Sequence, residues 1–244
     1  MTQAVPLPAV DGRGAAQINR TIASQRLITT SIDVVMCVRP QSLDVDQYVA
    51  VTLQSRATEA IDLDQAHVVK WKITDGVEVH AQHVTDGLPG DPFWGEGSTP
   101  DRSLYECYID PRGTLPAMAE RTLGFVFFRK NLVSRIGERY ALVDPYHQTL
   151  VDQPTSVTLV LPEPCFVEAP GAHRCTTRLA TWRFNSIGEQ TSIVASWTHG
   201  NEDSGIDARL AALYVARTCR RLGTVPPPHL DMGDGPGARA GRPG

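Results

Sequence analysis

Short apolar or alternating runs follow one another from residue 27 to about residue 200, and turn-forming residues separate them. Alternation with a period of two residues is typical of a β-strand that has one buried face. The runs are SIDVVMCV, QYVAVTL, AHVVKWKI, VEVHAQHV, SLYECYI, TLGFVFF, ERYALV, SVTLVL, RCTTRLATWRF and QTSIVASW. This succession predicts a mainly β fold, either an antiparallel β-sandwich or a jelly-roll-like arrangement.

Two interruptions in this pattern carry more specific predictions. The dipeptide Asp75-Gly76 lies between AHVVKWKI and VEVHAQHV and predicts a tight β-hairpin. Residues 86–102 contain Gly, Pro and Asp too densely for a regular element, so we expect a long loop that includes Phe93 and Trp94. The aromatic side chains of this loop either fold back onto the core or form a partner-binding surface.

One segment has the period of an amphipathic helix, from Ser204 to Leu222. Ser204 is the expected N-cap, and Gly223 with the following prolines is expected to end the helix. The residues expected on its buried face are Ile206, Leu210, Leu213 and Tyr214.

The domain organisation follows from these elements. Residues 1–26 form an expected N-terminal arm with room for a short helix, and residues 27–223 form the β-rich domain. That domain is one sandwich or two subdomains that meet near residue 150. Residues 224–244 have few apolar side chains, which predicts a disordered tail.

The charge of the chain limits its partners. A formal net charge of −4 gives no long-range attraction for nucleic acid, so such a partner would need a local basic patch. Lysine occurs at only three positions, Lys70, Lys72 and Lys130, so that 20 of the 23 basic residues are arginine. This excess reflects either base composition or the bidentate binding of phosphate, for which arginine is suited.

Cellular location is predicted from the cysteines and from hydropathy. The five cysteines are odd in number and widely spaced, which favours reduced, buried thiols. The first residues lack the features of a signal peptide, and no apolar stretch is long enough for a transmembrane segment. We therefore expect an intracellular protein that is not secreted.

Catalytic and metal-binding motifs are missing from the sequence. It contains no phosphate-binding glycine loop and no nucleophile elbow. His80 and His83, and the looser group of Cys165, His173 and Cys175, lack the paired spacing typical of zinc ligands. The sequence thus predicts no catalytic residue, no metal site and no cofactor.

Basic residues gather in two places. The first group brackets a turn after LGFVFF, and the second alternates with Thr, Leu and Trp182 along one expected strand. Arginines next to aromatic rings are typical of surfaces that bind single-stranded nucleic acid, although arginines also line the exposed face of many antiparallel sheets. The candidate phosphate contacts are Arg129, Lys130, Arg135, Arg139, Arg174, Arg178 and Arg183.

The stretch SIDVVMCVRPQSLDVDQYVAVTLQSRATEAIDLDQAHVVKWKI resembles the core of the thirty-kilodalton superfamily of plant-virus cell-to-cell movement proteins, and TLVLPEP and LATWRFNS are similar to its distal strands. That family typically has an Asp after the Leu of the second strand, where this chain has Gln54 and Ser55 after Leu53. The resemblance implies a jelly-roll-like protein that binds single-stranded RNA cooperatively, acts at plasmodesmata and has no enzymatic turnover.

Three functions remain open from the sequence. The first is a non-enzymatic viral movement protein in the host cytoplasm or at cell junctions, with single-stranded RNA as its partner. The second is a viral assembly protein of the capsid or matrix type, in which Phe93, Trp94 and the helix face contact neighbouring copies. Self-association is expected for both. The third is an enzyme whose site matches no known motif.

Overall fold

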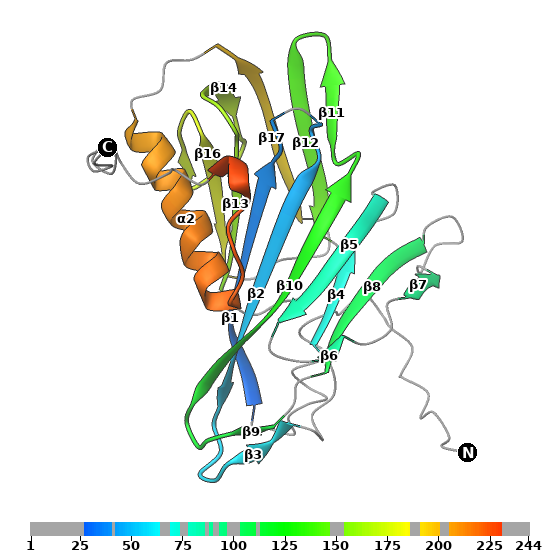
Figure 1. Ribbon diagram of the computed structural model, residues 1–244, viewed down its shortest axis with the longest axis vertical. Helices are drawn as coiled ribbons and strands as arrows, with labels where there is room; N and C mark the ends of the chain where they lie inside the picture. Colours follow the sequence, from blue (N-terminus) through cyan, green and yellow to red (C-terminus); the bar gives the residue numbers. More distant parts are fainter. Residues whose placement is uncertain are drawn as a thin grey trace, which may run out of the picture.

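The computed structural model describes residues 27–40, 42–63, 69–73, 78–85, 88–89, 93–96, 103–110, 113–146, 154–185, 191–200 and 205–230. Strands dominate these residues, and a single α-helix follows them near the C-terminus (Figure 1). This confirms the predicted mainly β fold class. The expected N-terminal arm and residues 231–244 lie outside the described residues.

A seven-stranded sheet forms the centre of the molecule. Its order is β15 (Arg174–Cys175), β16 (Leu179–Phe184), β13 (Thr155–Val160), β1 (Leu27–Val38), β2 (Val45–Ser55), β10 (Glu120–Lys130) and β5 (Glu78–Thr85). Neighbouring strands are antiparallel except β1 and β13, which run parallel from Ile32 and Thr155 to Cys37 and Val160. Because strands from both sides of residue 150 share this sheet, that residue does not separate two independent sheets.

A second sheet packs against one face of the first. It contains β11 (Val133–Ile136), β12 (Arg139–Tyr146), β17 (Thr191–His199) and β14 (Cys165–Glu168), in that order. Alternate residues of the strands face inward, as the period-two pattern predicts. The core between the sheets includes Val34, Phe125, Leu142, Trp182 and Trp197, each at most 2% exposed.

Helix α2 (Ile206–Leu222) covers the other face of the large sheet (Figure 1). Its buried residues include Ala211, Val215, Cys219 and Leu222, and they pack with Val35, Cys37, Tyr48, Ala50, Val160 and Leu179 of the sheet. The helix ends as predicted at Gly223, whose φ of 65° is a left-handed conformation that glycine adopts without strain. No helix in the described residues is long and apolar enough to cross a bilayer.

The predicted buried face of this helix was wrong in part. Ile206 and Leu213 are 70% and 64% exposed, whereas Leu210 and Tyr214 are half-buried. The helix approaches the sheet instead through a stripe that includes the small residues Ala211 and Cys219. Hydropathy gives little weight to such residues, although they allow the closest contact between a helix and a sheet.

Packing continues past the expected end of the domain at residue 223. A short 3-10 turn, η2 (Pro228–Leu230), follows the helix, and the side chain of Leu230 is 8% exposed within the core under α2. Leu230, in the expected tail, therefore belongs to the packed core.

Smaller sheets flank the sandwich. In one, β8 (Ser103–Asp110) pairs with β4 (Val69–Ile73), β6 (Leu88–Pro89) and β7 (Phe93–Glu96); in the other, β3 (Ile61–Asp62) pairs with β9 (Thr114–Leu115). The predicted hairpin was wrong, because β4 pairs with β8 whereas β5 pairs with β10. Phe93 and Trp94 lie on strand β7, not in a long loop.

Candidate functional site

The first predicted group of basic residues is dispersed by the fold. Arg129 is 2% exposed, and its guanidinium donates two hydrogen bonds to the Asp144 carboxylate, of 3.1 and 3.0 Å, and one to the Gln47 side chain. Its charge is thus neutralised inside the sandwich. Lys130, the next residue on β10, is half-buried. Arg129 therefore cannot form a solvent-facing surface with its neighbours.

Arg135 and Arg139 belong to the hairpin of β11 and β12. The Arg135 Nε donates a 2.9 Å hydrogen bond to the Gly137 carbonyl, and its guanidinium lies 5.5 Å from the centre of the Tyr140 ring. Arg139 forms an ion pair with Glu168 and a 2.7 Å hydrogen bond to the Ser196 hydroxyl. Both side chains are exposed, but local contacts already engage them.

The second predicted group lies on two strands, not one. Arg174 is on β15 and Arg183 on β16, while Arg178 lies between them and donates a 2.6 Å hydrogen bond to the Pro162 carbonyl. Arg174 is directly opposite Thr181, so both point to the same face of the sheet. Arg183, two residues beyond Thr181, also faces that side, which is the side that α2 covers.

Next to Arg183 the structure has a groove of about 330 Å³ between α2 and the large sheet. We call it the helix groove. Its lining is rich in hydroxyl groups and arginines and contains one carboxylate. The lining residues are Ser31, Asp33, Val35, Pro154, Thr155, Ser156, Thr158, Thr181, Arg183, Phe184, Asn185, Tyr214, Arg217, Thr218 and Arg221.

Strand register explains why the sheet side of the groove is polar. Ser156 on β13 lies opposite Asp33 on β1 and Arg183 on β16, so these three side chains form one row across the sheet. The next row contains Thr158 and Thr181, and the following rows become apolar where the buried stripe of α2 packs. The helix thus packs on the apolar rows and buries Thr158 and Thr181, at 2% and 1% exposed, whereas the row of Ser156 and Arg183 remains accessible.

The helix side of the groove is a second stripe of α2. Tyr214, Arg217, Thr218 and Arg221 recur at the spacing of one helical face, next to the buried stripe. Arg217 and Arg221 are not among the candidate site residues predicted from the sequence. A detectable signal existed, because these arginines share a face with a tyrosine, but nothing in the sequence shows that this face lies beside Arg183.

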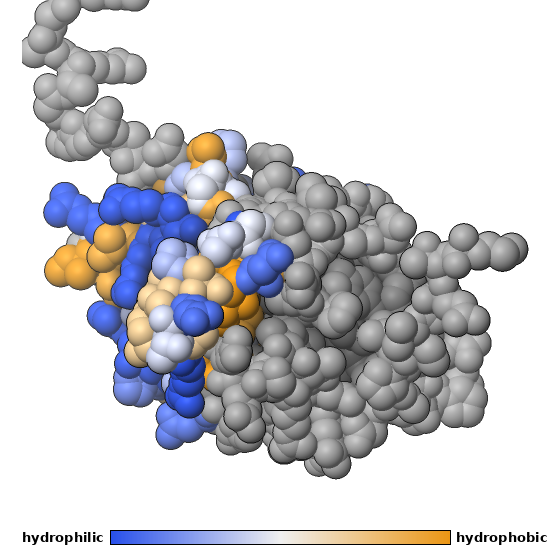
Figure 2. Space-filling model, turned by 90° about the horizontal axis from the view of Figure 1, so that it is seen from below, coloured by the Kyte–Doolittle hydropathy of each residue, from blue (hydrophilic) through white to orange (hydrophobic). Residues whose placement is uncertain are grey.

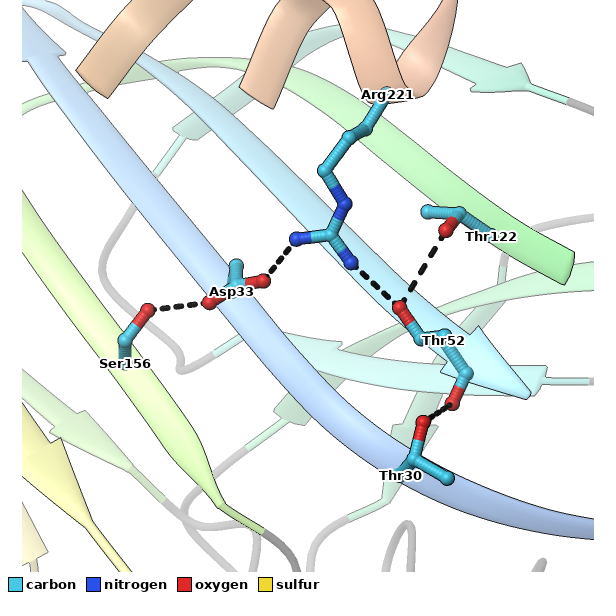
Figure 3. A network of polar contacts seen from close by, with 6 residues as sticks. All are labelled: Thr30, Asp33, Thr52, Thr122, Ser156 and Arg221. Carbon is cyan, nitrogen blue, oxygen red and sulfur yellow. Dashed lines mark hydrogen bonds and ion pairs between the residues drawn. The ribbon is translucent and has the colours of Figure 1, made fainter. Parts of the chain in front are cut away.

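A polar network holds one of these arginines in place (Figure 3). The Arg221 guanidinium forms an ion pair with Asp33 and donates a 2.5 Å hydrogen bond to the Thr52 hydroxyl. The Ser156 hydroxyl donates a 2.5 Å hydrogen bond to the other Asp33 oxygen. Thr52 also lies 3.4 Å from the Thr122 hydroxyl. Arg221 is therefore fixed at two points before any ligand arrives.

The charge of the helix groove is unbalanced. Its lining has three arginines and one carboxylate, which gives a formal charge of +2. Within the described part of the chain, Arg183 and Arg217 have no ion-pair or hydrogen-bond partner for their side chains, and both are exposed. In the view from below, the described residues show many hydrophilic side chains with separate apolar patches among them (Figure 2). The excess positive charge of the helix groove favours an anionic ligand.

A second pocket, of about 600 Å³, lies beside the edge strand β14 and includes Cys165, Cys175 and Arg139 in its lining. The Cys165 sulfur is 3.7 Å from His199 Nδ1, and a Glu163 oxygen is 2.5 Å from the same nitrogen. Burial, with a smaller contribution from Glu163, raises the pKa of the Cys165 thiol to about 11. A nucleophilic cysteine needs a thiolate, but this thiol stays protonated at neutral pH. The His199 Nδ1 that lies near the thiol also contacts the Glu163 carboxylate. The pair is therefore poorly suited to nucleophilic catalysis.

The remaining candidate residues are cysteines, histidines, Phe93 and Trp94. Cys37, Cys165 and Cys219 are buried free thiols, and Cys175 is an exposed one. Among the described residues no three His, Cys, Asp or Glu side chains are arranged to hold a metal ion. His80, His83, Phe93 and Trp94 lie on strands, but their side chains lie outside the described part of the structure.

Comparisons with known proteins found only weak likeness, to solved structures. No family model and no curated protein matches the sequence. Yeast LTA4 hydrolase in complex with bestatin is 10% identical, with 74% of this chain and 30% of that chain covered and a TM-score of 0.43. Native leukotriene A4 hydrolase of Saccharomyces cerevisiae is 12% identical, with 71% and 29% covered and a TM-score of 0.41.

A third similar structure is a mutant M1 zinc metallopeptidase from Deinococcus radiodurans bound to a Tyr-Ser-Ala substrate. It is 13% identical, with 72% of this chain and 43% of that chain covered and a TM-score of 0.37. The chain therefore spans less than half the length of each of these three proteins. Likeness at this level carries no argument about function.

Proposed function

We propose that this protein is a non-enzymatic RNA-binding protein whose helix groove binds the phosphates of single-stranded RNA. The observation that carries the proposal is the convergence of Arg183, Arg217 and Arg221 from two elements around one groove with a formal charge of +2. Guanidinium groups bind phosphate oxygens in bidentate fashion, and this contact supplies most of the affinity for nucleic acid.

The remaining lining of the groove is consistent with an RNA ligand. The Ser31 hydroxyl of β1 can donate to a phosphate oxygen, and the Ser156 hydroxyl of β13, which donates to Asp33, can accept from a ribose hydroxyl. Tyr214 offers an aromatic ring on which a base can stack. Arg174 extends the basic surface to the edge of the same sheet face. The resemblance to movement proteins supports cell-to-cell transport of viral RNA as the biological role.

The test is fluorescence anisotropy of a labelled single-stranded RNA between about 50 and 200 mM salt. A groove with a formal charge of +2 neutralises about two phosphate charges, which predicts a slope of log K against log salt of about −1.4, because single strands release about 0.7 counterions per phosphate charge neutralised. The double variant Arg183→Glu/Arg217→Glu should lose most of the affinity and flatten this slope.

The matched control is Arg209→Glu, which changes the charge of an exposed arginine on α2 outside the groove. It should bind RNA nearly as well as the natural protein. Equal losses from Arg209→Glu and from the groove variants would show that only overall charge matters and would contradict the proposal.

Assembly is a second candidate function, favoured by the outer face of the four-stranded sheet. Val143 on β12 lies directly opposite Val194 on β17, and they are 55% and 38% exposed. Ile136 and Phe166, at 74% and 58%, point from the two edge strands. Arg139 and Glu168 place opposite charges on the same face, so two copies related by a two-fold axis could exchange this ion pair.

Light scattering across protein concentrations, without RNA, tests this second candidate. The natural protein should form a dimer that the double variant Val143→Lys/Phe166→Lys abolishes. Leu213→Lys, at an equally exposed apolar residue on α2, is the control and should leave the dimer intact. A monomer at all concentrations would exclude assembly through this face.

A further inference from the structure

We propose that the helix groove selects the phosphorylated end of an RNA strand, holding one terminal nucleotide by its phosphate monoester. This inference rests on the proposed function, because it names which part of an RNA the groove recognises. Three features of the groove support it: its net charge, its volume and the fixed position of Arg221.

Charge distinguishes a terminal phosphate from an internal one. The lining has a formal charge of +2, from three arginines and Asp33. An internal phosphodiester carries a charge of −1, whereas a phosphate monoester carries about −1.5 to −2 at pH 7 and has three terminal oxygens. The monoester therefore matches the groove in both charge and number of acceptors, and an internal phosphate leaves one guanidinium without a counter-charge.

The volume of the groove favours one nucleotide over a continuous strand. At about 330 Å³ it is close to the lower end of the range of small-molecule sites, about 300–1,000 Å³. The apolar stripe of α2 packs on the sheet directly beside the polar rows, which closes the groove on that side. A groove of this volume, bounded on one side by the helix stripe, favours the end of a strand with its second nucleotide directed outward.

The position of Arg221 supports recognition of a single fixed group. Asp33 and Thr52 hold its guanidinium at two points, and Ser156 occupies the second oxygen of Asp33. Arg183 and Arg217, which have no such partners within the described residues, lie on opposite walls of the groove, one on the sheet and one on the helix. One pre-positioned donor and two free donors can surround a phosphate from three sides.

The experiment compares three ligands in anisotropy measurements and competition assays: an RNA oligonucleotide with a 5′-phosphate, the same oligonucleotide with a 5′-hydroxyl, and a free nucleoside monophosphate. We expect the 5′-phosphate form to bind about tenfold more tightly than the 5′-hydroxyl form, because charge-assisted contacts to the extra charge add to the affinity. The free monophosphate should bind more weakly than the 5′-phosphorylated strand, since it cannot reach Arg174.

A pH series gives an independent readout. The monoester loses its second proton near pH 6, so the ratio of the two oligonucleotide affinities should rise from pH 5 to pH 7. The charged and titratable groups that line the groove are Asp33 on β1, Arg183 on β16, and Tyr214, Arg217 and Arg221 on α2. The 5′-hydroxyl oligonucleotide, measured at each pH, is the control for changes in the protein itself.

The variants Arg183→Gln and Arg217→Gln should each reduce the 5′-phosphate preference, whereas Arg209→Gln should retain it. All three positions are exposed, and a thermal unfolding curve checks that each variant is folded. Equal binding of both oligonucleotides would overturn the end-selection inference and leave the proposed RNA binding intact. Binding of neither would overturn both. A nucleoside monophosphate that binds as tightly as the phosphorylated strand would identify a mononucleotide site instead.

Discussion

The ion pair of Arg129 and Asp144 shows how a single residue can connect the two sheets. Arg129 belongs to β10 of the large sheet and Asp144 to β12 of the small one, and both are nearly inaccessible to solvent. Gln47 of β2 contacts the same guanidinium. A buried charge is tolerated only when it is paired, so each partner of this bridge depends on the other.

We predict that Arg129→Met destabilises the protein by about 3–5 kcal/mol, because it leaves the Asp144 carboxylate buried without a counter-charge. The double variant Arg129→Met/Asp144→Leu should recover a large part of that loss, since it removes both charges. Urea denaturation of the two variants measures the difference. A single variant as stable as the natural protein would show that water reaches Asp144.

The buried thiols predict how stability depends on alkaline pH. Burial raises the pKa of Cys165 from 9.0 to about 11, and burial also raises the pKa of Cys37 and of Cys219. Between pH 9 and 11 the unfolded chain therefore releases protons that the folded chain retains, and the free energy of unfolding falls as pH rises. One thiol contributes up to about 1.4 kcal/mol per pH unit.

Denaturant titrations at several pH values above 8 test this expectation. The variant Cys165→Ala should show a smaller decline than the natural protein, whatever its stability at neutral pH. A free energy of unfolding that stays constant from pH 9 to 11 would contradict it.

At the scale of elements, helix α2 offers a matched pair of leucines. Leu222 is 4% exposed in the core under the helix, whereas Leu213 is 64% exposed. We predict that Leu222→Ala costs about 2–4 kcal/mol and that Leu213→Ala changes stability by no more than about 0.5 kcal/mol. Thermal or urea denaturation measures both. Equal effects would mean that the helix packs through a different face.

The same helix shows what a sequence can and cannot predict. Its existence and its end at Gly223 follow from local pattern, as do most strands, because periodicity and turn residues are local signals. Which distant residues contact one another in the fold does not follow from a local pattern. The Asp75-Gly76 signal could not reveal that β5 pairs with β10 and β4 with β8. Likewise Arg183 was a candidate, but its meeting with Arg217 and Arg221 depends on packing between distant segments.

At the scale of the whole molecule, the large sheet contains strands from the parts of the chain before and after residue 150. Strands β13 and β16 lie on one side of β1, and β2 and β10 lie on the other. Because β1 and β13 bury their inner faces in one common core, a fragment with either strand alone exposes much of that core.

We therefore predict that the fragments 1–146 and 154–244 do not fold separately. Each should lack a cooperative thermal transition by circular dichroism, and a mixture of the two should regain it. Cooperative unfolding of either fragment alone would support the alternative of two subdomains that meet near residue 150.

The parallel pairing of β1 with β13 also has a consequence during synthesis. About 120 residues separate the end of β1 from the end of β13, and α2 follows later still. At about 5–20 residues per second, the ribosome needs roughly 6–24 s to deliver the missing neighbour. Throughout that interval the nascent chain presents an open strand edge and an uncovered apolar face. We expect newly made chains to depend on chaperones in this window, and slow codons before residue 155 to prolong it.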